Sequence, residues 1–229
     1  MDLRSLHQTA RTLGYWSRAQ DVTANNLANA NTAGFKLDRI TAAEARDGSY
    51  PVPVQETDLA QGRLRETSRE LDLALEGDGY LVVQAPNGER LTRGGALRLD
   101  ADSQLVSMEG FPILGEDGQP IVLPAGTLTV TPEGLVQIDG EQIATLQLRR
   151  PAEGTRLLKE GNGRFVADGA VEAADAVRVR QGQVEEPNGD TLSGMVDLIT
   201  IQRAYTANAD AMKAMDRVLG TITSDIGRL

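Results

Sequence analysis

The chain of 229 residues contains no cysteine and a single histidine. Without thiols it can form no disulfide, thiolate nucleophile or cysteine-ligated metal site. His7 has no second histidine beside which it could ligate a metal, and its polar helical surroundings indicate a solvated or interface side chain and not a site. Only 3% of the residues are aromatic, which leaves little surface on which a sugar could stack. The sequence therefore predicts no enzymatic activity, no metal site and no cofactor.

Long apolar runs are also missing. No stretch approaches the roughly eighteen consecutive apolar residues that a membrane-spanning helix needs. The first sixteen residues mix Asp2, Arg4 and Arg11 among their apolar neighbours, which is not the pattern of a cleavable secretory signal. We expect neither a membrane span nor a cleaved leader.

Negative charge dominates, but only in the middle of the chain. The net charge is −10. Residues 1–46 carry 6 basic and 4 acidic groups, residues 190–229 carry 4 and 5, and residues 47–189 hold the remaining 13 and 24. The acidic middle argues against nucleic acid as a partner. Nearly neutral ends are what we expect of surfaces that other protein covers.

Both ends have helical periodicity. In the first segment, small or apolar residues recur with heptad spacing and predict an amphipathic helix of about 28 residues. The positions with this spacing form the predicted seam, the row expected to face a partner helix, and are Leu3, Leu6, Ala10, Leu13, Ser17, Gln20, Ala24 and Leu27. The asparagine-rich run that follows competes with helical hydrogen bonding, and Gly34 is expected to take a positive φ, so the helix should end between Asn29 and Gly34.

The last segment mirrors the first. Its helix should begin near Asp190 or Thr191, after the turn Pro187-Asn188-Gly189. An apolar stripe with one polar exception follows the helical period at Leu198, Ile201, Tyr205, Asn208, Met212, Met215, Leu219, Ile222 and Ile226. Neither helix has a core of its own, so the two should pair, with the rest of each stripe left for neighbouring subunits.

The middle of the chain is predicted to form β structure. Short β-rich runs are separated by Gly, Pro, Asn and Asp clusters about ten residues apart, and Pro86-Asn87-Gly88 signals a hairpin. The runs are 80–84, 96–99, 126–130, 135–138, 143–148 and 177–180. The predicted fold class is α+β, in which the N- and C-terminal helices pair in a coiled-coil-like helical domain and an antiparallel all-β domain is inserted between them. The predicted segments are an N-terminal helix (1–35), an extended linker or arm (36–70), the β domain (71–188) and a C-terminal helix (189–229).

Several motifs that could carry chemistry are better explained as turns. Gly77-Asp78-Gly79 and Gly161-Asn162-Gly163 lack the lysine of a phosphate loop. The spacing of acidic residues from Asp100 starts like a calcium loop but has Leu105 where glycine is required. Glu185 and Glu186 could in principle form a glycosidase pair, but sequence alone cannot place two carboxylates across one cleft.

The motifs at both ends resemble those of flagellar rod and hook proteins. At the end of the first helix the chain reads Ala24-Asn25-Asn26-Leu27-Ala28-Asn29-Ala30-Asn31-Thr32-Ala33-Gly34-Phe35-Lys36. The last helix carries Met195-Val196-Asp197-Leu198-Ile199, then Gln202-Arg203-Ala204-Tyr205 and Asn208. The middle contains similar motifs at 77–83, 92–95 and 179–186, so the resemblance covers nearly the whole chain.

Within that family the chain looks most like the proximal-rod (FlgF-type) members, with the distal-rod (FlgG-type) members a close second. It departs from the family after Glu186, where Pro187-Asn188-Gly189 replaces the usual Ser-Asn-Val and leaves the entry into the last helix open. The resemblance implies a structural subunit of the flagellar basal-body rod in the periplasmic space. It also implies export by the flagellar type III apparatus without a cleaved signal, and helical stacking with itself and other rod subunits.

The resemblance and the periodicity together give a candidate assembly interface on the two helices and the turn after the first. Alternatives that stay open are a distal-rod or hook-related axial subunit and, in a different class, a free adaptor with a coiled coil and a ligand-binding β domain. The candidate residues are Leu3, Leu6, Leu13, Asn25, Asn26, Leu27, Asn29, Thr32, Gly34, Phe35, Leu198, Ile201, Gln202, Arg203, Tyr205, Asn208, Met212, Met215, Leu219 and Ile222.

Overall fold

The computed structural model describes residues 3–43 and 52–226. It contains two long helices and antiparallel strands, so the α+β class is confirmed. The chain forms two compact units. The first comprises Met1–Ala30, Leu37–Asp58 and Gly189–Leu229, and the second comprises Asn31–Lys36 and Leu59–Asn188.

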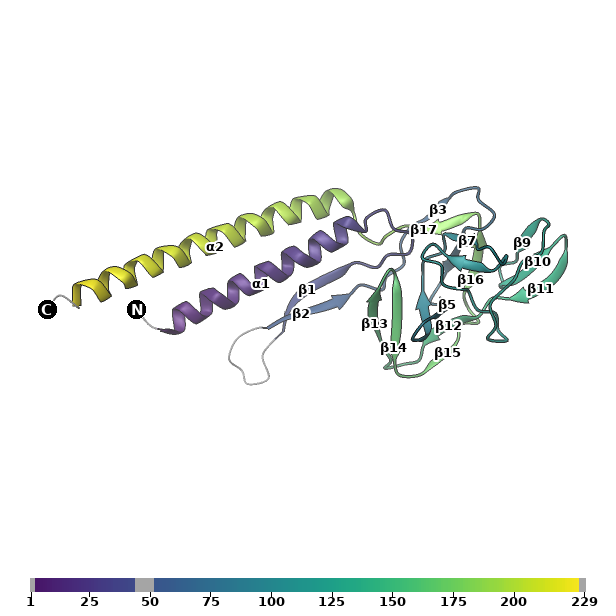
Figure 1. The fold of residues 1–229 in the computed structure, drawn as a ribbon, viewed down its shortest axis with the longest axis horizontal. Coiled ribbons are helices and arrows are strands. Elements are labelled where there is room, and N and C mark those ends of the chain that lie inside the picture. Colours follow the sequence, from purple (N-terminus) through teal and green to yellow (C-terminus); the bar gives the residue numbers. More distant parts are fainter. Residues whose placement is uncertain (1–2, 44–51, 227–229) are drawn as a thin grey trace. The chain divides into compact units, whose positions relative to one another are not determined.

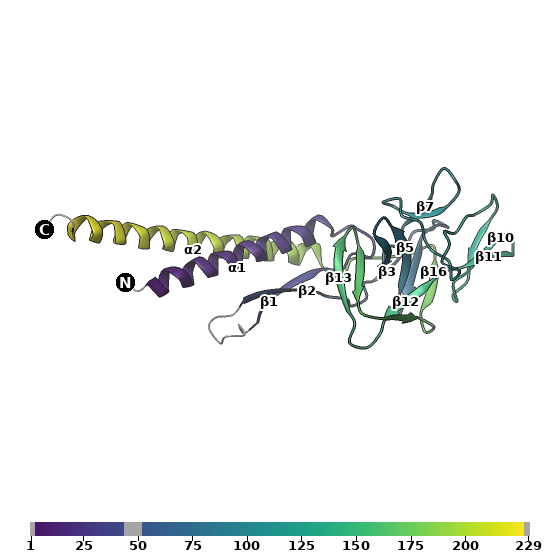
Figure 2. The ribbon, with the colours of Figure 1, turned by 60° about the horizontal axis from the view of Figure 1, so that its bottom comes forward.

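The first unit is built from the two helices and one hairpin. Helix α1 (Leu3–Ala28) packs against helix α2 (Thr191–Ile226), and both views of the ribbon show them side by side (Figures 1 and 2). The hairpin pairs β1 (Asp38–Ala43) with β2 (Val52–Thr57) in antiparallel register and contacts α1. These strands lie in the range expected to be an extended linker. Neither helix, over its described length, combines the length and apolar character needed to cross a membrane.

The start of α2 agrees with the sequence prediction, and α1 ends one residue before the predicted range of 29–34. Helix α1 stops at Ala28, and Gly34 takes the positive φ of 68°. Helix α2 begins at Thr191, where Oδ2 of Asp190 accepts a hydrogen bond from the amide of Ser193 at 2.9 Å. Although Pro187-Asn188-Gly189 departs from the family pattern, the helix after it starts with an ordinary N-cap at Asp190.

The second unit is antiparallel throughout. Its largest sheet has six strands in the order β13-β14-β6-β5-β12-β15, and smaller sheets are β11-β10-β9, β16-β4, β17-β3 and β7-β8. The hairpin predicted at residues 86–88 joins β5 and β6. The strands are β3 (Leu64–Glu66), β4 (Leu73–Glu76), β5 (Tyr80–Ala85), β6 (Gly88–Thr92), β7 (Leu97–Leu99), β8 (Leu105–Ser107), β9 (Leu128–Val130), β10 (Leu135–Ile138), β11 (Glu141–Thr145), β12 (Leu148–Pro151), β13 (Arg156–Gly161), β14 (Arg164–Asp168), β15 (Val171–Ala173), β16 (Arg178–Gln181) and β17 (Gln183–Glu185).

The core of this unit is aliphatic and comes from nearly every strand. Its larger cluster contains Leu73, Leu81, Leu97, Ile113 and Leu146, all at most 1% exposed. A smaller cluster surrounds Phe165, whose ring meets Tyr80 edge to face. Because this apolar core lies entirely within the second unit, it needs nothing from the helices to exclude water.

Candidate assembly surfaces

The predicted stripe of α2 lies partly against α1. Leu198, Ile201 and Met212 are half-buried, as are Asn208 and Met215, and Oγ1 of Thr9 on α1 lies 4.0 Å from Sδ of Met215. Tyr205, in the same row, is exposed. The pairing of the helices thus covers this face only in part. The side chains of Leu219 and Ile222, like those of Leu3 and Leu6, lie outside the described ones.

On α1 the most buried residues are Ala19 and Val22. Of the predicted seam, Leu13, Gln20 and Leu27 are half-buried, whereas Ala10, Ser17 and Ala24 are exposed. The most buried face therefore lies to one side of the predicted seam. The reason is that α1 contacts both α2 and the β1–β2 hairpin. The hairpin buries residues beside the face that α2 alone would cover.

The asparagines at the end of α1 make different contacts. Nδ2 of Asn26 donates to the carbonyl of Asp38 at 2.7 Å, and its Oδ1 accepts from the Asp38 amide at 3.0 Å. Its amide group thus holds the start of β1 in the way a neighbouring strand would. Nδ2 of Asn29 bonds the carbonyl of Asn25 at 2.9 Å and satisfies one of the orphan acceptors of the helix end. The side chain of Asn25 itself is exposed.

The next residues of the same motif are built into the second unit. Thr32 is half-buried, and Gly34, Phe35 and Lys36 are buried. The Gly34 amide donates to the carbonyl of Glu185 at 2.7 Å, and a Cβ on Gly34 would lie 2.2 Å from the carbonyl oxygen of Arg93. Glycine is required here both by its positive φ and by this close approach of another backbone.

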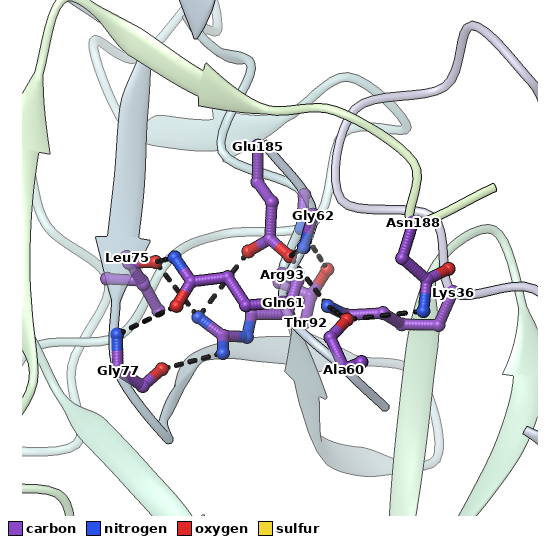
Figure 3. A network of polar contacts seen from close by, with 11 residues as sticks. Lys36, Ala60, Gln61, Gly62, Leu75, Gly77, Thr92, Arg93, Glu185 and Asn188 are labelled. Carbon is purple, nitrogen blue, oxygen red and sulfur yellow. Dashed lines mark hydrogen bonds and ion pairs between the residues drawn. The ribbon is translucent and has the colours of Figure 1, made fainter. Parts of the chain in front are cut away.

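A buried ion cluster holds this segment in place (Figure 3). Lys36, which is fully buried, donates from Nζ to Oε1 of Glu185 at 2.6 Å and to the carbonyl of Ala60 at 2.7 Å. The same Oε1 accepts from the Gly62 amide at 2.8 Å, while Oε2 lies 3.5 Å from Nη1 of Arg93. Each charge in the cluster therefore has an opposite charge within reach, which is the condition for burying it.

The second cation of the cluster is also fixed by backbone. Arg93 donates to the carbonyls of Leu75 at 3.1 Å and Gly77 at 2.6 Å, and its guanidinium lies 5.2 Å from the ring centre of Tyr80. Burial raises the pKa of the Tyr80 phenol, and the positive charge of Arg93 opposes that rise. One carbonyl within β4 and one just after it are thus satisfied by a side chain from the turn after β6.

Lys159 also contacts this segment. Its Nζ donates to the carbonyl of Lys36 at 2.6 Å and lies 3.8 Å from the ring centre of Phe35. This is a cation–π contact that supports a ring almost completely withdrawn from water. Phe35 therefore has its partners within this chain.

Sequence reasoning did not bring Lys36, Arg93 and Glu185 together. Each lies in a different recognised motif, namely 24–36, 92–95 and 179–186, and their convergence is visible only in three dimensions. A charged residue inside an otherwise apolar or glycine-rich motif is the only signal that could have marked them. The cluster also rules out Glu185 and Glu186 as a catalytic pair, because Glu185 is bound to Lys36 and Glu186 pairs with Arg65 at 2.9 Å in a partly exposed position.

Three family profiles match the chain. They are "Flagella basal body rod protein" over residues 15–36, "Flagellar hook protein FlgE/F/G D1 domain" over residues 74–138, and "Flagellar basal body rod FlgEFG protein C-terminal" over residues 180–225. The first ends on Lys36, the second spans Arg93 and the third includes Glu185. The three matched regions therefore meet at the buried ion cluster.

Similar proteins cover nearly the full length. The flagellar basal-body rod protein FlgF of Caulobacter vibrioides is 33% identical, and the alignment covers 93% of this chain and 92% of that protein. FlgF of Salmonella typhimurium is also 33% identical, over 86% of this chain and 88% of its own. The rod protein FlgG of Borreliella burgdorferi is 29% identical, with coverages of 87% and 90%.

Proposed function

Because the chain belongs to the family of flagellar basal-body rod proteins and resembles its FlgF members, we propose that it assembles into the rod through the outward faces of its two terminal helices. It is a structural subunit of the basal body and not an enzyme. Rod proteins assemble with other rod components, and the proposal concerns the surfaces that do so here.

The observation that carries the proposal is the apolar surface that α2 leaves exposed. Leu192 is 70% exposed, and Met195, Val196 and Ile199 are each about half exposed. Their spacing of three and four residues places them on one face of the helix. Fully burying such side chains contributes about 1.5–3 kcal/mol each. Contiguous exposed apolar residues on one helix face are typical of a surface that binds protein.

We infer a coiled-coil-like pairing of α1 with α2 within each subunit, which leaves both outward faces free for neighbours. In this view Leu13, Leu27, Leu198, Ile201 and the residues that follow them on α2 hold the helix pair together. Gln202, Arg203 and Tyr205 are exposed and available to other subunits. Gly34 and Phe35 act indirectly, since they anchor the turn after α1 in the β unit.

The remaining parts of the proposal follow from the family. We infer a periodic stack of subunits in the periplasmic section of the rod, and export of this chain by the flagellar type III apparatus without a cleaved signal. A proximal position is favoured by the resemblance to FlgF, and a distal or hook-related position is the alternative. A free adaptor protein would need no polymeric partner and is distinguished by the same experiment.

The test compares two neighbouring positions on α2. Ile199→Asp places a carboxylate in the exposed apolar face, whereas Thr200→Asp places one about a quarter turn away at another exposed position. Both side chains are exposed in the monomer, so neither change should lower its stability by more than about 1 kcal/mol. We expect Ile199→Asp to abolish motility and incorporation into basal bodies, and Thr200→Asp to retain both.

The readout is the amount of the chain in basal bodies purified from a strain that lacks its own copy, normalised to the exported amount. Circular dichroism of each purified variant controls for folding. If the wild-type chain is absent from basal bodies, or if the two variants are incorporated equally, the proposed role of this face is wrong.

A further inference from the structure

The exposed apolar face of α2 lies on the side of the helix opposite its contact with α1. Residues that face α1 recur at Leu198, Ile201, Met212 and Met215. Leu192, Val196 and Ile199 are turned about half a helical revolution away from that row. No segment of the described chain covers them. A second copy of the chain is the simplest source of a surface that could cover them.

The chain offers a complementary surface on the outward side of α1. Six exposed positions there are spaced alternately by four and three residues, opposite the buried Ala19 and Val22. Five of the six are small residues, and the exception is an aspartate. They are Ala10, Gly14, Ser17, Asp21, Ala24 and Ala28. Small side chains at heptad spacing leave the holes into which large side chains of a facing helix fit.

The two surfaces also match in charge. Asp21 interrupts the small residues of α1, and Arg203 continues the α2 face one turn beyond Ile199. Both side chains are exposed, and neither forms an ion pair within the described ranges. Each is thus an unpaired charge beside an otherwise uncharged row.

The pairing of the helices within one chain supplies a register. Thr9 lies opposite Met215, and α1 and α2 run in opposite directions (Figure 1). Asp21 is twelve residues after Thr9, and Arg203 is twelve residues before Met215. If a second copy presents its α1 in that same alignment, Asp21 lies opposite Arg203, and Ala24 lies beside Ile199.

We propose that the outward face of α1 in one copy packs on the outward face of α2 in the next copy, with Asp21 of one chain paired to Arg203 of the other. This rests on the proposed function, assembly through the terminal helices. The two faces belong to different sides of the same chain, so the contact is heterologous and repeats from copy to copy. Such a contact builds a ring or a helical row of subunits, and a closed dimer does not satisfy it.

The first arm of the test uses the absence of native cysteine. Chains carrying Ala24→Cys and chains carrying Ile199→Cys are co-expressed, and basal bodies are isolated and oxidised with copper phenanthroline. We expect a disulfide-linked dimer on a non-reducing gel. Thr200→Cys replaces Ile199→Cys as the control, because that side chain is about a quarter turn away. We expect at least tenfold less dimer from the control pair.

The second arm exchanges the charges. Asp21→Arg and Arg203→Asp should each reduce incorporation into basal bodies about tenfold, because like charges then face each other across the contact. The double variant should restore incorporation. Co-expression of the two single variants should also restore it, since each chain then carries one face that fits the other chain. Restoration by mixing cannot come from a contact within one chain.

The outcomes separate this inference from the proposed function. If the wild-type chain is present in basal bodies but Ala24 and Ile199 do not cross-link above the control and the single charge variants assemble normally, the proposed contact is wrong and assembly through the helices still stands. Loss of incorporation in the single variants without restoration in the double variant also overturns the pairing. Absence of the wild-type chain from basal bodies overturns both.

Discussion

The ammonium of Lys36 lies 2.6 Å from Oε1 of Glu185, although 149 residues separate the two in the chain. This pair closes the second unit by joining the segment after α1 to the last strand before α2. Lys36 is fully buried and Glu185 is 1% exposed. Without Glu185 the ammonium of Lys36 would be an uncompensated buried charge, and without Lys36 the carboxylate would keep only the more distant Arg93. The stability of the β unit should therefore depend on a residue that precedes all of its strands.

Lys36→Ala should destabilise the second unit by about 3–5 kcal/mol, because it leaves the buried carboxylate of Glu185 without its closest cation. Hydrogen exchange of the strand amides of this unit, followed against urea concentration in the full chain, measures the change. Arg178→Ala is the matched control, since Arg178 pairs with Glu133 at 3.3 Å with both side chains more than half exposed. We expect less than about 1 kcal/mol there. Equal effects would show that the buried pair is not a stabilising contact.

Gly34→Ala should cost more than the same change at another glycine with the same backbone conformation. Gly34 has φ 68° and its added Cβ would meet the Arg93 carbonyl, whereas Gly118 has φ 74° and no atom within 4 Å of that position. We expect about 1–2 kcal/mol for Gly118→Ala from backbone strain alone. Gly34→Ala adds a clash that requires the turn after β6 to move. Thermal unfolding of the two variants measures the difference, and similar melting temperatures would contradict the close approach.

Asn26→Ala should speed up hydrogen exchange of the backbone amide at the start of β1. The substitution removes both hydrogen bonds to the backbone of Asp38, a residue that is 6% exposed, and should cost about 1–3 kcal/mol. Hydrogen exchange at the Asp38 amide should accelerate accordingly. Asn25→Ala is the control, since the Asn25 side chain is exposed and its carbonyl remains in place. Unchanged protection of the Asp38 amide in Asn26→Ala would mean that these two hydrogen bonds do not stabilise the start of β1.

The stability of the β unit should fall in strong alkali through Tyr80. Burial raises the pKa of its phenol above the ordinary value of 10.0, so the folded state holds the proton more tightly than the unfolded state does. The contribution is fully present below pH 10 and is lost as the pH rises through the folded pKa. Tyr80→Phe cannot ionise and should show a smaller loss of stability between pH 9 and 11, measured by urea denaturation. Identical pH profiles would show that Tyr80 does not titrate on unfolding.

Local structure was predictable where it depends on neighbours in the sequence. The two helices, the stop before Gly34, the hairpin at residues 86–88 and the start of α2 all follow from periodicity, turn residues and a cap. The run 143–148, predicted as one strand, is divided between β11 and β12. Its apolar pattern is continuous, and only pairing with different partners, β10 for one part and β5 for the other, separates the two strands.

The sequence by itself determined that this chain has two amphipathic helical ends, an acidic β middle and the motifs of an axial flagellar protein. The tertiary structure decided which helix faces stay exposed, since the hairpin and α2 both contact α1 and displace the predicted seam. It also decided that Lys36, Arg93 and Glu185 form one buried cluster. The physical reason is the range of the interactions. Capping, turns and periodicity act over a few residues, whereas burial and ion pairing act between residues that only the fold brings together.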